Sequence, residues 1–144
     1  MMTLRMLAEC TGLTEKTLRN YMRMGLLRGE KSRGKWQFPP EALEALLTHP
    51  YTRPSIRRQG RILVEDFLQG ARGGERACVV LDLCRAAPED GARLRRALVE
   101  SVNRSVPPVR MVYEQDAAQA RVFLSGDAQT VQACLAACRA RCDG

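Results

Sequence analysis

Basic, hydroxyl and amide side chains recur at helical spacing in a short segment near the start of the chain. In the stretch EKTLRNYMR they are Lys16, Thr17, Arg19, Asn20 and Arg23. Residues three and four apart lie on one face of a helix, so a helix here presents most of these side chains together. Cationic and amide groups in such an array pair with phosphate oxygens and with the edges of bases. The pattern therefore indicates recognition of a nucleic acid.

A second basic group follows in the stretch RGEKSRGKWQF. Its cations are Lys31, Arg33 and Lys35, and Trp36 comes directly after them. Gly34 suits a tight turn, so we expect a β-hairpin with Arg33 and Gly34 near its tip. Such a hairpin would add a second cationic surface to the first.

Two short helices joined by a glycine-containing turn are predicted to position the first group. The first helix runs from Thr3, its N-cap, to Cys10, and Gly12 suits the turn that follows. The second helix has Thr14 as N-cap and runs to about Met24. A helix, a short turn with glycine and a second helix form the layout of a DNA-reading helix-turn-helix.

The same stretch resembles a known family. LAECTGLTEKTLRNYMRMGLL is similar to the MerR-type (mercury-resistance regulator) helix-turn-helix. The matching positions are Gly12, Thr14, Thr17, Leu18, Arg19, Tyr21, Gly25, Leu26 and Leu27. The stretch GKWQFPPEALEALL is similar to the wing and the next helix of that superfamily, although Trp36 makes the wing closer to the excisionase type. The resemblance covers residues 3–48 and implies a winged helix-turn-helix of a bacterial transcriptional regulator.

Two features depart from the family pattern. Asn20 stands where the family has a tyrosine. The family continues into a long antiparallel coiled coil that sets its dimer, whereas this chain has a proline-containing break at 49–54 and a modest helix expected over 55–69.

The resemblance and the charges together imply a set of DNA-binding residues. They are Thr14, Lys16, Thr17, Arg19, Asn20, Tyr21, Arg23, Lys31, Arg33, Lys35 and Trp36. Lys16, Thr17 and Asn20 are the candidates for base edges, and Arg19 and Tyr21 for phosphates. Tyr21 and Trp36 are amphipathic, so a place in the core is the alternative for both side chains.

The second half alternates between strand and helix patterns. We expect strands at 76–84, 109–115 and 121–125, and helices over 88–104 and from an Asp127 N-cap onward. This order predicts an α+β fold, in which the winged helix-turn-helix precedes a βαββα domain with both helices on one face of a three-stranded sheet. The other face or an edge of that sheet could pair with a second copy.

Composition suggests three regions and a basic first half. A glycine-rich break at 70–74 separates a DNA-binding domain at 1–48 and a connecting segment at 49–70 from a dimerisation or effector domain at 71–144. The net charge is +7, with 12 Lys/Arg against 7 Asp/Glu in residues 1–70 and 11 against 9 in residues 71–144. Arg57, Arg58 and Arg61 are expected to extend the phosphate contacts, whereas Arg93, Arg95 and Arg96 are expected on the surface.

The cysteines suggest a sensor, although a structural role is the simpler interpretation. Cys134, Cys138 and Cys142 are spaced four apart on an expected helix, where thiols could share a soft metal or form a redox pair. The first two also lie on that helix's apolar stripe, and reduced cysteine is a common core residue. We expect no metal site and no cofactor.

Other functional classes find little support. His49 is the one histidine, and no Ser/His/Asp or Cys/His set is present, so we expect no enzyme. No stretch is apolar enough for a signal peptide or a membrane span, so we expect a cytoplasmic protein without a membrane partner.

The sequence therefore favours a homodimeric, sequence-specific regulator that binds double-stranded DNA, with a second domain that dimerises or binds a small-molecule effector. Two alternatives stay open. One is an excisionase-like architectural protein that bends DNA. The other is a protein-interaction module for which DNA binding is secondary.

Overall fold

The computed structural model of this chain describes residues 1–70, 73–84, 88–116 and 119–142. The first part contains a helix-turn-helix, a β-hairpin and a further helix. Its elements are β1 (Met2–Thr3), α1 (Leu4–Thr11), α2 (Glu15–Arg23), β2 (Glu30–Ser32), β3 (Lys35–Phe38) and α3 (Pro40–Thr48). Strand β1 pairs with β3, which gives a small antiparallel sheet of order β1-β3-β2 that the sequence did not predict in full.

The second part is a larger antiparallel sheet with helices on both faces. Its elements are α4 (Arg53–Gln69), β4 (Arg76–Cys84), α5 (Pro88–Asn103), β5 (Arg110–Gln115), β6 (Gln119–Asp127) and α6 (Ala128–Cys142). The strand order is β4-β6-β5, so β6 is central. The expectation of a fold that mixes helix with sheet is confirmed.

Local signals explain where the helices begin. The Thr3 hydroxyl accepts the Met6 N–H at 3.1 Å, and the Asp127 carboxylate accepts the Thr130 N–H at 3.0 Å. These N-cap bonds satisfy amide groups that lack a partner inside the helix. The bonds from Thr130 also hold the pKa of Asp127 below its usual value. Pro40 begins α3 at a position where the missing N–H costs nothing.

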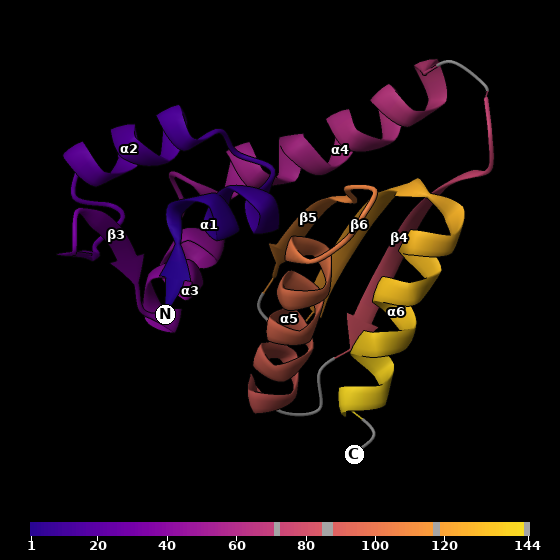
Figure 1. The fold of residues 1–144 in the computed structure, drawn as a ribbon. Coiled ribbons are helices and arrows are strands. Elements are labelled where there is room, and N and C mark those ends of the chain that lie inside the picture. Colours follow the sequence, from indigo (N-terminus) through magenta and orange to yellow (C-terminus); the bar gives the residue numbers. More distant parts are fainter. Residues whose placement is uncertain (71–72, 85–87, 117–118, 143–144) are drawn as a thin grey trace.

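The two faces of the sheet pack against different helices. Figure 1 shows α5 and α6 side by side over one face, and α4 crosses the other. Alternate side chains of β6 point toward α5 and α6 on one face and toward α4 on the other, because successive side chains of a strand point to opposite faces. Phe123 points to α4, where its ring lies against Gly60, and Leu124 is fully buried.

Helix α4 therefore packs on the sheet as well as connecting the two halves, which the sequence did not predict. The prediction left the second face of the sheet free, but α4 covers its β5 and β6 side. The β4 side is less covered, since Val80 remains 51% exposed. Buried side chains form one continuous cluster from Leu4 to Cys138, and α1 also lies against β5. The glycine-rich break expected at 70–74 includes residues 71–72, which lie outside the described residues.

We expect Gly60→Ala to destabilise the protein. A Cβ at Gly60 would lie 2.5 Å from Cε2 of Phe123, a ring that the core holds in place. Overpacking of this kind costs about 1–3 kcal/mol, whereas alanine regains about 1 kcal/mol of helix propensity. The expected net loss in the free energy of unfolding is therefore up to about 2 kcal/mol, measured by urea denaturation. Gly73→Ala is the control, since its Cβ would meet nothing within 4 Å. Equal stability of both variants would show that α4 is not closely packed on the sheet.

Candidate nucleic-acid interface

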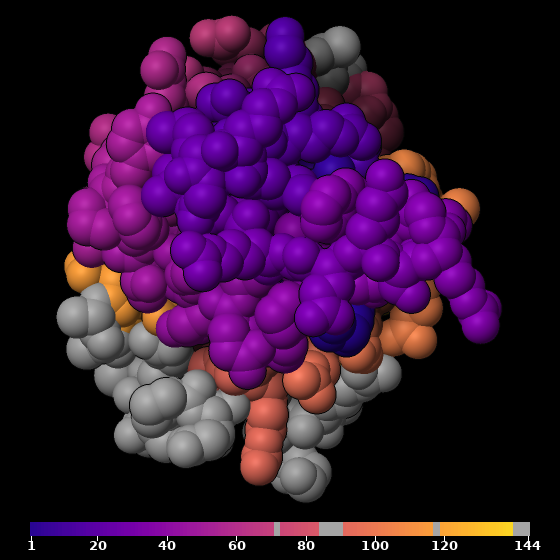
Figure 2. All heavy atoms as spheres, turned by 90° about the vertical axis from the view of Figure 1, so that its left-hand side faces the viewer, coloured from indigo at the N-terminus to yellow at the C-terminus, as the bar shows by residue number. Residues whose placement is uncertain are grey.

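The outward face of α2 presents the polar group that the sequence singled out. Lys16, Arg19, Asn20 and Arg23 are exposed, and Thr17 is half-buried. The opposite face anchors the helix, since Leu18 is fully buried. Figure 2 views the molecule from this side and shows the first third of the chain, coloured indigo to purple, covering most of that face. The basic face of α2 is therefore free to contact a large partner.

The first turn of α2 is held by its N-cap. The Thr14 hydroxyl accepts the Thr17 N–H at 3.1 Å and lies 2.9 Å from the Thr17 hydroxyl. Glu15 in the first turn and Arg23 in the last both complement the helix dipole. The cap fixes the part of the helix from which Lys16 and Thr17 project.

Asn20 is held only weakly within the protein. Its side-chain NH₂ donates to the sulfur of Met24 at 3.7 Å, and both residues are exposed. A thioether is a poor acceptor, so little is lost when the amide turns to a better partner. An amide in this position can pair with an adenine edge.

The hairpin has the predicted tip. Strands β2 and β3 pair with Ser32 opposite Lys35, which leaves Arg33 and Gly34 as the two turn residues. Their φ angles are +53° and +79°, as a tight two-residue turn between twisted strands requires. Lys31, Arg33 and Lys35 are all exposed. We call β2, β3 and this turn the wing.

Trp36 joins the wing to the core. Its ring stacks on Phe38 with centroids 6.4 Å apart, and Phe38 is fully buried. The Lys31 ammonium lies 6.0 Å from the Trp36 ring centroid, within reach of a cation–π contact. Trp36 itself is half-buried. One edge of Trp36 thus packs on the core, and its expected contact with DNA stays a prediction.

Tyr21 lies in the core of this unit. It is 5% exposed, and its ring meets Tyr51 edge-on with centroids 6.3 Å apart. The contact ties α2 to the segment that leads into α4. Its expected contact with a phosphate stays a prediction.

The sequence did not predict one partly buried polar cluster. Arg95 was expected on the surface, but it is 6% exposed, and its guanidinium donates to Glu44 at 2.9 Å. The Gln115 amide donates to the same carboxylate at 2.8 Å. The cluster joins α3 to α5 and β5. Arg95 stands three residues before Leu98 and four before Val99, both buried, so helical periodicity carried a signal for its burial.

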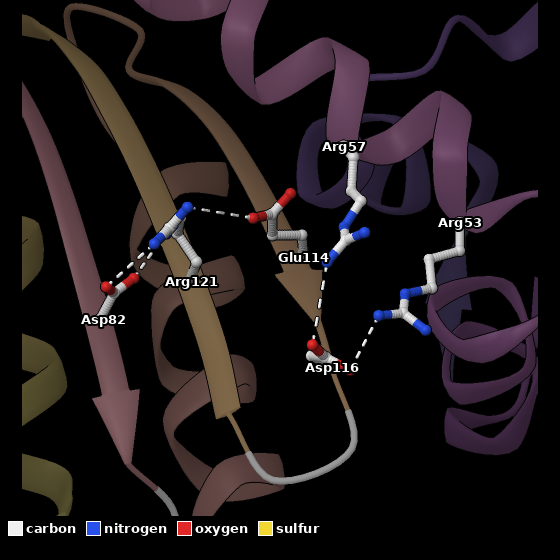
Figure 3. A network of polar contacts seen from close by, with 6 residues as sticks. All are labelled: Arg53, Arg57, Asp82, Glu114, Asp116 and Arg121. Atoms are coloured by element: carbon white, nitrogen blue, oxygen red, sulfur yellow. Dashed lines mark hydrogen bonds and ion pairs between the residues drawn. The ribbon is translucent and has the colours of Figure 1, made fainter.

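The arginines of α4 face acidic groups of the sheet. Figure 3 shows Arg53 and Arg57 directed at Asp116, with nitrogen–oxygen distances of 2.8 and 3.8 Å. Arg57 and Arg61 also line a groove of about 430 Å³ beside Arg121. Arg57, at least, is engaged within the protein, and a phosphate contact by Arg57, Arg58 or Arg61 stays a prediction.

The same network ties neighbouring strands together. Arg121 on β6 binds Asp82 on β4 at 2.5 and 3.0 Å, and lies 3.9 Å from Glu114 on β5. The hydrogen bond from Arg121 lowers the pKa of Asp82, whereas burial raises the pKa of Glu114. These are cross-strand pairs of a kind that stabilises sheets.

Cys10, Cys134 and Cys138 lie in the core, whereas Cys78 is half-buried. Burial raises the pKa of Cys10 to about 12, which leaves it a thiol at neutral pH. Cys134 lies 3.1 Å from the Ser105 hydroxyl, and Cys138 faces the Leu94 carbonyl at 3.8 Å. The side chain of Cys142 lies outside the described residues. Across the described part of the chain, no group of three or more His, Cys, Asp or Glu is placed to hold a metal ion.

No described helix combines the length and the apolar character that crossing a membrane requires.

The family model of the MerR HTH family regulatory protein matches residues 2–49. A search of curated proteins and a search of solved structures gave no match. The N-terminal third of the chain is thus a MerR-type helix-turn-helix, as its motif spacing predicted.

We expect Thr14→Ala to destabilise α2 through loss of its N-cap. Removing such a hydroxyl costs about 1 kcal/mol in the free energy of unfolding, which urea denaturation followed by circular dichroism would measure. Thr14→Ser keeps the hydroxyl and should stay close to the parent protein. If the alanine and serine variants unfold at the same urea concentration, the Thr14–Thr17 bond does not stabilise the helix.

Proposed function

We propose that this protein is a transcriptional regulator that binds specific sequences of duplex DNA as a homodimer in the bacterial cytoplasm. The observation that carries the proposal is the pairing of two exposed basic surfaces, the α2 face and the wing, on a unit that matches the MerR family model. The MerR-type match favours a regulator, and the basic surfaces provide the means to bind DNA.

In this proposal α2 enters the major groove. Such a recognition helix reads base edges with its outward side chains, and here these are Lys16, Thr17 and Asn20. Arg19 and Arg23 neutralise phosphates at the groove edge, and Lys31, Arg33 and Lys35 of the wing follow the backbone. The geometry of the N-cap and of the wing turn supports this division, because it presents both groups as rigid elements.

A dimer would present two such units to an inverted repeat. The exposed Val80 on the edge strand β4 supports a pairing surface in the second half of the chain. The short α4 leaves this half, rather than a coiled coil, as the element that would set the distance between the two recognition helices. That distance would in turn set the spacing of the half-sites.

The Glu44–Arg95–Gln115 cluster favours a regulator over an architectural protein. It runs from α3 of the DNA-binding unit to α5 and β5 of the other half. A change in the second half would therefore reach the DNA-binding unit through a partly buried polar contact to the nearly buried Arg95 guanidinium, which tolerates little displacement. A protein that only bends DNA has no need for such a connection.

Selection of bound sequences from a random pool of duplex DNA, with the mass of the protein measured in solution, tests the proposal. We expect an enriched inverted repeat and the mass of a dimer. Binding should weaken steeply with salt, by about 0.9 log units per log unit of salt for each phosphate neutralised. A monomer with equal affinity for all sequences would overturn the proposal and favour the architectural alternative.

We expect Lys16→Ala and Asn20→Ala to weaken binding to the selected site by about 1–3 kcal/mol each and to relax the preference at one base position. The physical reason is the loss of a bidentate contact to a base edge. Arg93→Ala is the control, because it removes a charge from an exposed position on α5. Fluorescence anisotropy with labelled duplexes that carry single base changes measures both effects. Unchanged base preference in both variants would show that other residues read the bases.

A further inference from the structure

A pocket of about 350 Å³ lies between the DNA-binding unit and α5. Its walls come from both halves of the chain: Met2 from β1, Met6 from α1 and Leu43 from α3 on one side, with Arg96 and Val99 from α5 on the other. Figure 1 shows the N-terminus and α3 on the side of α5 that faces away from α6. This pocket is separate from the basic faces of α2 and the wing, and the proposed contacts with DNA do not use it.

The floor and walls of the pocket are mainly apolar. Leu43 is 2% exposed and Val99 is 3% exposed, so most of the accessible hydrocarbon surface comes from Met2, Met6 and Pro40. Met2 and Met6 are half-buried, and methionine side chains adapt to ligands of different shape. A lining of this kind with few polar groups is typical of small-molecule sites, which are often found where two structural units meet.

The polar groups at the pocket are predominantly cationic. Arg95 is already satisfied by Glu44, whereas Arg96 is exposed and has no hydrogen bond or ion pair with any side chain that the structure describes. Among the described residues of the lining, Glu100 is the one carboxylate. Because Glu44 already compensates the charge of Arg95, it is Arg96 that favours an anionic ligand, and its exposed guanidinium can turn to pair with a carboxylate.

We infer that this pocket binds a small amphiphilic anion, with its apolar body on the methionine, leucine and valine side chains and its carboxylate on Arg96. A cationic amphiphile would place its charge beside Arg95 and Arg96, and a neutral one would leave Arg96 without a partner. Both should therefore bind less tightly than the carboxylate.

The position of the pocket implies a regulatory use, and this part rests on the proposed function. A ligand that touches α1, α3 and α5 at once changes how the DNA-binding unit sits against the second half of the chain. Such a ligand alters the affinity for DNA if its contacts differ between the two arrangements. The proposed effector of the regulator is therefore an apolar carboxylic acid.

Titration calorimetry of the full chain with octanoate, without DNA, tests the site. We expect saturable binding, with much weaker binding of octan-1-ol and of octylammonium. Arg96→Gln should lower the affinity for octanoate at least fivefold. Arg93→Gln changes an exposed residue of the same helix and should leave that affinity unaltered. Absence of saturable octanoate binding, equal binding of the cation, or equal affinities of the two variants would overturn the assignment.

A second variant tests the pocket by its volume instead of its charge. Ala92 is exposed and lines the pocket, so Ala92→Trp should fill it and abolish octanoate binding, whereas Ala92→Ser should not. Circular dichroism of both variants verifies that they are folded. Octanoate binding that survives the tryptophan would place the ligand elsewhere and overturn the assignment.

The proposed regulatory role of the pocket is tested by measuring the affinity of the protein for the selected DNA with and without saturating octanoate. A change of severalfold in the parent protein that is lost in Arg96→Gln supports it, and an unchanged affinity overturns it. A protein that binds octanoate but has no affinity for DNA would refute the proposed function while the pocket assignment stands.

Discussion

The close packing of α4 on the three-stranded sheet is the constraint on which the rest of this molecule depends. Gly60 allows the helix backbone to approach the Phe123 ring, and Ile56 and Leu63 are buried along the same helix. Closely packed protein interiors do not deform gradually, so α4 keeps its position on the sheet. Because α4 follows α3 within a few residues, its position on the sheet also determines where the helix-turn-helix lies.

The ion pairs that join α3 and α4 to the rest of the molecule differ greatly in how much they contribute to stability. The pairs that Arg53 and Arg57 form with Asp116 involve a half-buried and an exposed arginine and an exposed carboxylate, and pairs of this kind add little to stability. The pair between Arg95 and Glu44 holds a guanidinium that is almost fully buried. Loss of its partner would leave an uncompensated charge in the interior, which is far more costly. The pair between the buried Arg95 guanidinium and the partly exposed Glu44 therefore constrains how α3 meets α5 and β5 more strongly than the surface pairs do.

This arrangement leaves the DNA-binding surfaces unobstructed. Figure 1 shows α2 and the wing at the end of the molecule away from the larger sheet. The same construction places a pocket behind the DNA-binding unit, where β1, α1 and α3 meet α5. A surface for DNA on one side and a ligand pocket on the other, joined by a rigid core, is an arrangement suited to a regulator.

The sequence by itself determined the local features of this protein. The N-caps Thr3 and Thr14, the turn at Arg33 and Gly34, and the exposed face of α2 all follow from short-range preferences and from the family spacing. Only the tertiary structure decided the burial of Arg95, the covering of the sheet by α4 and the pocket between the two halves. Each of these brings together residues far apart in the chain, and the free energy that selects them comes from packing and desolvation, which a local pattern does not contain. Glu44 and Gln115 are 71 positions apart, and their contact depends on where the sheet places β5.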